Sequence, residues 1–320
     1  MRTLAALISA ALILQGCSLI DIELQPRIRP LEEETVEGQG KAKILLMDVS
    51  GVLADETGGI VLGSPPPRVP IVARVREELQ KASEDESVKA LVVRINSPGG
   101  TITASDLIYR EIDVFKTRRK IPVIAIMMDV GASGGYYAAL AADTIMALPT
   151  TVTGSIGVVM LTVNAQGLME KIGVAPLAIK SGAMKDAGSP FRPLTEQERT
   201  VFQSVIDQMY GRFVSLIVRS RKMSEEKVRA AADGRIYTAE QAKALGLVDE
   251  IGYMEDAVTA ARKAAGVEEA RVIMYRRPKE YRANFYSAAP APMPGVESSL
   301  QQLTALVSGS GPRFLYLWWP

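Results

Sequence analysis

The stretch that decides the fold is Asp129–Leu140, which has the sequence DVGASGGYYAAL. It follows the apolar run 121–128 and leads into an alanine-rich helical pattern, so it predicts a strand, a tight turn and a helix. Ser133 lies at this turn, beside the first free amides of the helix, where the helix dipole stabilises negative charge. Ser133 is therefore a candidate nucleophile. The alternative is that Ser133 only caps the helix, and that Gly134 and Gly135 allow close packing of helix on sheet.

The usual base of a serine mechanism is missing, because the 320 residues include no histidine. A Ser-His-Asp or Cys-His mechanism is thereby excluded. Lysine is the remaining side chain that can take a proton from an alcohol, once burial favours its neutral form. A lysine at position 185 lies in a loop, 180–191, that contains two glycines and a proline.

Strand and helix patterns alternate on both sides of this turn. Strands are expected at 43–49, 88–95, 121–128, 144–148 and 175–179, and helices at 69–82, 103–115, 165–172, 195–222 and 224–232. Capping boxes mark two of the helix starts, at Thr103 and Thr195. Repeated strand-helix units with right-handed crossovers predict an α/β fold, in one large domain or two small ones.

A second glycine turn, Asn96–Thr101, closes the strand expected at 88–95. Gly99 and Gly100 can turn the backbone with no side chain in the way, and this leaves amides exposed at the carboxyl end of a strand. Amides exposed at this position can donate hydrogen bonds to a ligand. A plain Pro-Gly turn explains the same residues equally well.

The N-terminus has the pattern of a secretory signal, with a short positive region followed by the apolar run Leu4–Leu14. Cys17, the single cysteine of the chain, lies where a bacterial lipoprotein signal has its lipidated cysteine. We expect residues 1–16 to be removed and Cys17 to carry lipid, which anchors the protein outside the cytoplasm, in the periplasm or on its membrane face. An ordinary secretory signal with an incidental cysteine is the alternative. Residues 17–40, rich in Pro, Glu and Gln, read as a flexible tether.

Composition narrows the function further. The net charge is +1, and no basic stripe interleaved with aromatic residues is present, so a nucleic-acid partner is not expected. Without histidine, and with the one cysteine assigned to lipid, no metal site and no cofactor is expected.

Four motifs carry a resemblance to a known family. They are Ser97–Gly100, Ala132–Tyr136, Thr153–Gly157 and Ser181–Asp186, and in this order they resemble peptidase family S49, the signal peptide peptidase A family, in its short single-domain form. The resemblance covers about residues 43–277. It implies the spiral of repeated ββα units that Clp protease and crotonase share, over a peptidase domain that we place at 41–280.

The resemblance also implies a role for each site residue. Ser133 is the nucleophile and Lys185 its general base. Ser155 is the hydroxyl that holds the lysine amine. The amides of Gly100 and Gly134 form the oxyanion hole, in agreement with the independent interpretation of both glycine turns.

Two charged residues near Lys185 need a separate expectation. Lys180 ends a strand pattern and is expected to face solvent. Asp186 should project away from its neighbour Lys185 and bond to backbone or to another subunit. If Asp186 faced Lys185, it would stabilise the charged amine and the mechanism would fail.

The function that the resemblance implies is a membrane-associated serine endopeptidase. It would cleave apolar peptides, such as remnant signal peptides, by acyl transfer, and it would assemble into a homo-oligomeric ring. Two other classes stay open: a crotonase-like acyl-CoA enzyme, and a catalytically silent lipoprotein scaffold of the same fold.

The last segment, 281–320, reads as a Pro-rich linker and an aromatic tail that includes Phe314, Trp318 and Trp319. Three interpretations are open for this tail. It is a terminal strand that docks on its own domain, a contact with a membrane surface, or a segment that reaches an apolar active-site groove.

Overall fold

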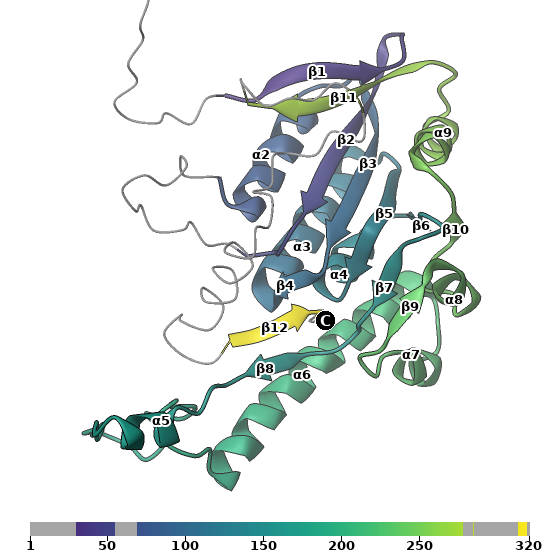
Figure 1. Cartoon of the computed structure of the whole chain (residues 1–320). Coiled ribbons are helices and arrows are strands. Elements are labelled where there is room, and N and C mark those ends of the chain that lie inside the picture. The colour runs from purple at the N-terminus through teal and green to yellow at the C-terminus, as the bar shows by residue number, and fades with distance from the viewer. Residues whose placement is uncertain (1–29, 55–68, 278–283, 285–312, 319–320) are drawn as a thin grey trace, which may run out of the picture.

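The computed structural model of the chain describes residues 30–54, 69–277, 284 and 313–318 (Figure 1). A mostly parallel sheet forms the centre, in the order β1-β11-β2-β3-β5-β6-β10, with β7 on β5 and β9 on β7. Its strands are β1 (Glu32–Glu37), β2 (Ala42–Ser50), β3 (Val88–Ser97), β5 (Val123–Ala132), β6 (Thr144–Ala147), β7 (Val152–Gly154), β9 (Ile236–Thr238), β10 (Glu250–Ile251) and β11 (Ala270–Arg276). A small second sheet has the order β4 (Gly99–Thr101), β12 (Arg313–Leu317) and β8 (Val159–Leu161).

Helices cover both faces of the large sheet, as in other parallel sheets. The helices are α2 (Ile71–Ser83), α3 (Ile102–Arg119), α4 (Gly134–Ala139), α5 (Gln166–Lys171), α6 (Glu196–Arg221), α7 (Glu225–Ala231), α8 (Ala239–Ala244) and α9 (Met254–Ala265). Leu45 and Met47 of β2 share a buried cluster with α2, α3 and α4, whereas Ile44 and Leu46 share one with α9. Side chains of β2 are thus buried on both faces, which explains why its sequence is a continuous apolar run. The predicted α/β class is confirmed.

Helix α3 begins two residues before the start that its capping box predicts. Its N-cap is Thr101, whose Oγ1 accepts a hydrogen bond from the amide of Ala104 at 3.2 Å. The short strand β4 ends at Thr101, so the helix starts directly where the strand stops. The cap predicted for the long helix is correct, because Thr195 and Glu198 form the capping box of α6.

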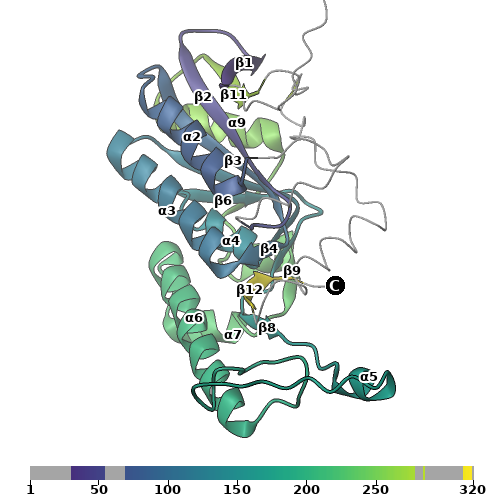
Figure 2. The same cartoon turned by 90° about the vertical axis from the view of Figure 1, so that its left-hand side faces the viewer.

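The strand expected at 175–179 is absent, since residues 173–180 form neither strand nor helix. Leu177 and Ile179 are 87% and 96% exposed. They belong to the segment 162–195 between β8 and α6, here called the arm, which projects away from the sheet (Figures 1 and 2). An apolar run alone does not make a strand, because a strand needs a neighbour to pair with, and Pro176 lacks the amide donor for such pairing.

Both ends of the described chain are paired in a sheet. Residues 32–37, placed in the tether by the sequence, form β1, which pairs antiparallel with β11. The partly buried Val36 packs against the cluster beneath α9, and this contact explains why the fold begins before position 41. At the other end β12 pairs with β4 and β8, so the docked-strand interpretation holds for Arg313–Leu317.

Other sequence expectations concern residues that the structure does not describe. Residues 1–16, Cys17 and most of the linker at 281–312 lie outside the described ranges. Among the described helices, none combines the length and the apolar character needed to cross a membrane.

Candidate active site

Ser133 lies at a strained turn between β5 and α4. Its φ is 51° and its ψ −113°, a backbone conformation that L-residues rarely adopt. Two hydrogen bonds hold it there: the Ser133 amide donates to the carbonyl of Gly154 at 2.8 Å, and its carbonyl accepts from the Tyr137 amide at 2.8 Å. Ser133 is the N-cap residue of α4, but its side chain makes no capping bond to the helix, so capping does not explain a serine at this position. Strain that the surroundings hold in place is a common feature of functional sites.

Ser155 comes to this turn through the pairing of β5 with β7. The two strands run parallel, with Ala132 opposite Gly154, and the hydroxyl of Thr153 donates to the Gly131 carbonyl at 2.6 Å. Ser155 directly follows Gly154, whose carbonyl accepts from the Ser133 amide. Ser155 also has a positive φ, 48°, and is 9% exposed. The sequence motifs around both serines therefore meet in space.

The two glycine turns lie side by side. A Cβ added at Gly99 would stand 2.7 Å from the amide nitrogen of Gly134, and one at Gly134 would stand 3.1 Å from the Cα of Gly99. As the first residue of α4, Gly134 has an amide without a partner inside the helix. Gly100 follows Gly99 in β4. The geometry thus brings together the two residues whose amides were expected to bind an oxyanion.

Close packing explains Gly135, the third glycine of the nucleophile turn. A Cβ at Gly135 would approach the carbonyl oxygen of Ser97 to 2.7 Å. The packing alternative raised by the sequence therefore holds at this position, where helix α4 crosses the end of β3.

Strand β12 lies across the two glycine turns. Tyr316 pairs with Gly100 and Leu317 with Gly99, and the Trp318 amide donates to the Pro98 carbonyl at 2.8 Å. A Cβ at Gly99 would come within 2.0 Å of the Tyr316 carbonyl oxygen, and one at Gly134 within 3.1 Å of it. A peptide carbonyl from the chain itself therefore occupies the place between the two turns.

The side chain of Tyr316 fills an aromatic pocket beside the site. Its ring centre lies 5.2 Å from that of Tyr137 and 4.8 Å from that of Phe213. Its hydroxyl donates to the carbonyl of Met209 at 2.8 Å. Burial raises the pKa of Tyr316, so the phenol stays protonated as a donor. The pocket accepts a large aromatic side chain from a strand paired with β4.

Lys185 is the one site residue that the chain does not bring to this place. It is exposed and belongs to the arm, which in both views projects away from α4 (Figures 1 and 2). The single chain thus assembles Ser133, Ser155, Gly100 and Gly134, and presents Lys185 on a separate part of its surface.

Asp186, the neighbour of Lys185, binds two other cations. Its carboxylate accepts from Lys180 Nζ at 2.5 Å and from Arg192 at 2.8 and 3.0 Å. These hydrogen bonds, first that of Arg192 and then that of Lys180, hold the pKa of Asp186 well below its usual range. The partners of the Asp186 carboxylate are side chains of the arm, where backbone or another subunit was expected. Lys180 is exposed, as expected, and its amine also binds Asp186. Sequence reasoning missed Arg192, because no motif or helical period links it to Asp186.

Two family models match the chain. Residues 116–268 match peptidase family S49, and residues 45–154 match Clp protease. The chain is 40% identical over 254 residues to a putative signal peptide peptidase SppA of Enterococcus faecium, a match that covers 77% of this chain and 70% of that protein. It is also 40% identical over 232 residues to the putative protease slr0021 of Synechocystis, with 72% and 78% covered. A solved structure of a ClpP1 mutant from Listeria monocytogenes is similar at 20% identity and a TM-score of 0.43, and the match covers 67% of this chain and 94% of that one.

Proposed function

Because the chain belongs to peptidase family S49 and is a serine peptidase, we propose that it is a membrane-associated endopeptidase acting through a dyad of Ser133 and Lys185. Its substrates are apolar peptides, such as remnant signal peptides. One observation carries the proposal: Ser133 is held in a strained turn, with Ser155 beside it and the Gly99–Gly100 turn close to the amide of Gly134. The peptidase relatives favour this function over an acyl-CoA enzyme or a silent scaffold.

The proposed reaction is acyl transfer in two steps. Neutral Lys185 takes the proton of the Ser133 hydroxyl, whose oxygen attacks the carbonyl carbon of the peptide bond. The resulting oxyanion accepts hydrogen bonds from the amides of Gly100 and Gly134. The Lys185 ammonium then gives its proton to the leaving amine, and an acyl enzyme remains. Water, deprotonated by Lys185, then attacks the acyl carbon, and the bond from that carbon to the Ser133 oxygen breaks. The Lys185 ammonium returns its proton to the Ser133 oxygen, and Ser155 orients the amine throughout.

Strand β12 supports a binding mode for the substrate. It shows that the space between β4 and β8 accepts an extended peptide in antiparallel pairing, with a carbonyl at the glycine turns and a ring in the pocket of Tyr137 and Phe213. A substrate bound in this way gains main-chain hydrogen bonds whatever its sequence, and the pocket favours apolar side chains. We therefore propose that β12 leaves when a substrate binds.

The position of Lys185 supports a dyad that forms between subunits. The arm that carries it exposes several large apolar side chains, namely Leu168, Ile172, Leu177 and Ile179, which are between 62% and 96% exposed. Several large apolar side chains exposed on one segment favour a contact with another protein, because exposed apolar surface is costly in water. In the proposed homo-oligomeric ring, the arm of one copy packs its apolar side chains against a neighbour. This contact delivers Lys185 to the neighbour's Ser133.

Lipid on Cys17 is the proposed anchor. It would place the ring on the extracytoplasmic side of a bacterial membrane, where cleaved signal peptides are released into the lipid phase.

Hydrolysis of a panel of apolar peptides tests the proposal. We expect no cleavage by Ser133→Ala and none by Lys185→Arg, since a guanidinium does not deprotonate at working pH. Lys171→Arg is the matched control on the same arm and should keep wild-type rates. Cleavage by Ser133→Ala would refute the nucleophile, and cleavage by Lys185→Arg would refute the base.

A further inference from the structure

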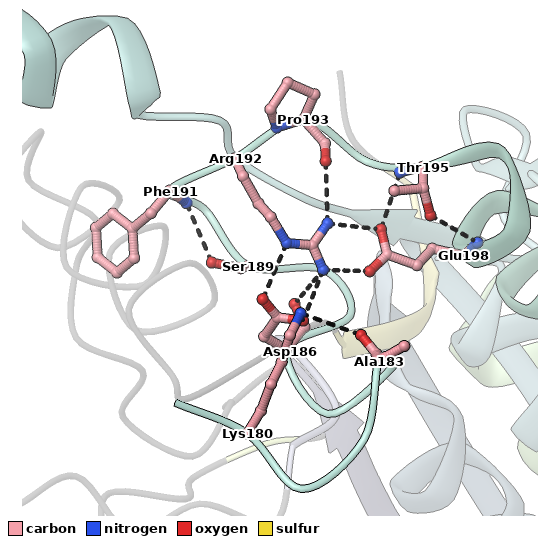
Figure 3. Close-up of polar contacts among 9 residues, drawn as sticks. All are labelled: Lys180, Ala183, Asp186, Ser189, Phe191, Arg192, Pro193, Thr195 and Glu198. Atoms are coloured by element: carbon pink, nitrogen blue, oxygen red, sulfur yellow. Dashed lines mark hydrogen bonds and ion pairs between the residues drawn. The ribbon is translucent and has the colours of Figure 1, made fainter. Parts of the chain in front are cut away.

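Arg192 connects the Lys185 loop to the start of helix α6. Its Nε and Nη2 donate to the two carboxylate oxygens of Asp186 at 3.0 and 2.8 Å, and Nη2 also donates to the Asp186 carbonyl at 3.1 Å (Figure 3). The same guanidinium binds Glu198, through Nη1 at 3.0 Å and through a short bond from Nη2. One side chain thus joins two carboxylates that lie twelve residues apart.

Glu198 is a fixed point for this connection. Its side chain is 1% exposed, and it accepts the amide of Thr195 at 2.9 Å while its own amide donates to the Thr195 hydroxyl at 3.2 Å. This capping box belongs to the 26-residue helix α6, whose later turns pack into the core through Phe213 and Ile217. Arg192 therefore ties the loop to a rigid element rather than to another loop.

Asp186 directly follows the proposed base Lys185 in the chain and carries a carboxylate. A carboxylate that lies against an amine stabilises its ammonium form, and an ammonium is no base. In the structure, one oxygen of Asp186 is bound by Lys180 and Arg192, and the other by Arg192 alone. Loss of Arg192 would leave the second oxygen without this partner, one residue along the chain from Lys185.

We propose that Arg192 is a positioning residue of the peptidase, which fixes the Lys185 loop on α6 and keeps the Asp186 carboxylate away from the Lys185 amine. The inference rests on the proposed role of Lys185 as the base, and it assigns a regulator of that base which neither sequence motif nor fold implies. The charged groups that contact one another in this cluster are Asp186, Lys180, Arg192 and Glu198. Arginine suits the task better than lysine, because its planar fork binds two carboxylates at once.

The pH–rate profile separates this role from a merely structural one. The rate of wild type should rise with pH as Lys185 becomes neutral. In Arg192→Gln the rising limb should move by about one pH unit or more to higher pH, because the freed carboxylate favours the ammonium. In Arg192→Gln/Asp186→Asn the limb should return to its wild-type position, although a looser loop keeps the maximal rate low.

Two further arginine variants serve as controls. Arg199→Gln, at an exposed arginine on the first turn of α6, should leave both the limb and the rate unchanged. Arg192→Lys keeps the charge but not the fork, and it should shift the limb less than Arg192→Gln does; it also tests the inference if Arg192→Gln does not fold. A uniform loss of rate without a shift of the limb in either variant would overturn the inference.

The role of Lys185 as the base and the role of Arg192 can be refuted separately. If Lys185→Arg cleaves peptides, the base is wrong and the dyad falls with it. If Lys185→Arg is inactive while the limb of Arg192→Gln and of Arg192→Lys stays at its wild-type pH, the dyad stands and only the role of Arg192 is refuted.

Discussion

Gly100 lies where the backbone leaves no room for a side chain. A Cβ there would stand 2.0 Å from the carbonyl oxygen of Leu53 and 2.5 Å from its carbonyl carbon. Both atoms are backbone, so they cannot turn away as the end of a flexible side chain can. We expect Gly100→Ala to lower the free energy of unfolding by about 1–3 kcal/mol, the usual cost of overpacking, and urea unfolding measures this loss.

Gly211 provides the matched control for this substitution. It lies inside helix α6, and nothing stands within 4 Å of an added Cβ. Gly211→Ala should stabilise the protein by about 0.5–1 kcal/mol, because alanine is the better helix former. Equal unfolding free energies for Gly100→Ala and wild type would show that the loop at Leu53 yields, and that Gly100 is not needed for close approach.

Sequence reasoning located the residues of the nucleophile turn because their signals are local. Ser133, Gly134 and Gly100 each lie between a strand pattern and a helix pattern, and the carboxyl ends of parallel strands meet at one edge of the sheet. The absence of histidine directed the search for a base to lysine. Arg192 was not predictable in this way. The path of the loop brings it to Asp186 and Glu198, and no helix or strand periodicity in the sequence indicates that path.

Strand β12 supplies the element whose removal is most informative. Truncation after Gly311 should raise kcat/KM for apolar peptides, because it frees the space between β4 and β8. It should also lower the melting temperature, because it removes Tyr316, a fully buried ring packed on Tyr137 and Phe213. A synthetic peptide of residues 312–320 should then inhibit the truncated enzyme competitively. A lower melting temperature with unchanged turnover would mean that β12 is only structural.

The contacts of Arg192 with Asp186 and Glu198, which link the arm to α6, should weaken at low pH. The hydrogen bond from Arg192 lowers the pKa of Glu198 from 4.5 to about 2, and it also lowers that of Asp186. A carboxylate whose pKa is depressed by folding stabilises the fold above its unfolded value, and this stability is lost as the pH falls through the folded value. The melting-temperature difference between wild type and Arg192→Gln should therefore be constant above about pH 5 and shrink from there toward pH 2. A difference that stays constant down to pH 2.5 would contradict the assigned contacts.

Whole elements were predictable wherever their signals agreed. The capping box at Thr195 and the long amphipathic pattern gave α6 nearly to its ends, and the continuous apolar run of β2 gave a central strand. The strand expected at 175–179 failed because its apolar residues lie on the arm, where none of the described strands pairs with them. Strand β1 was missed because its acidic, exposed face resembles a solvated tether.

Anchoring concerns the molecule as a whole. If Cys17 accepts lipid, Cys17→Ser should stay unprocessed by the lipoprotein pathway, because the thiol is the acceptor. Intact-mass measurement and labelling with radioactive palmitate check this. A normal mature mass with normal labelling in Cys17→Ser would contradict the lipoprotein proposal.

The proposed dyad has to form between subunits, since one chain holds Ser133 in its core and Lys185 on an exposed arm. The most direct test of this account is to mix Ser133→Ala with Lys185→Arg, dissociate and reassemble them, and measure peptide cleavage. Each variant alone should be inactive, and the mixture should recover a substantial fraction of wild-type activity at those sites where an intact Ser133 meets an intact Lys185 from the neighbouring copy. An inactive mixture whose subunits are shown by native mass spectrometry to have exchanged would contradict the account.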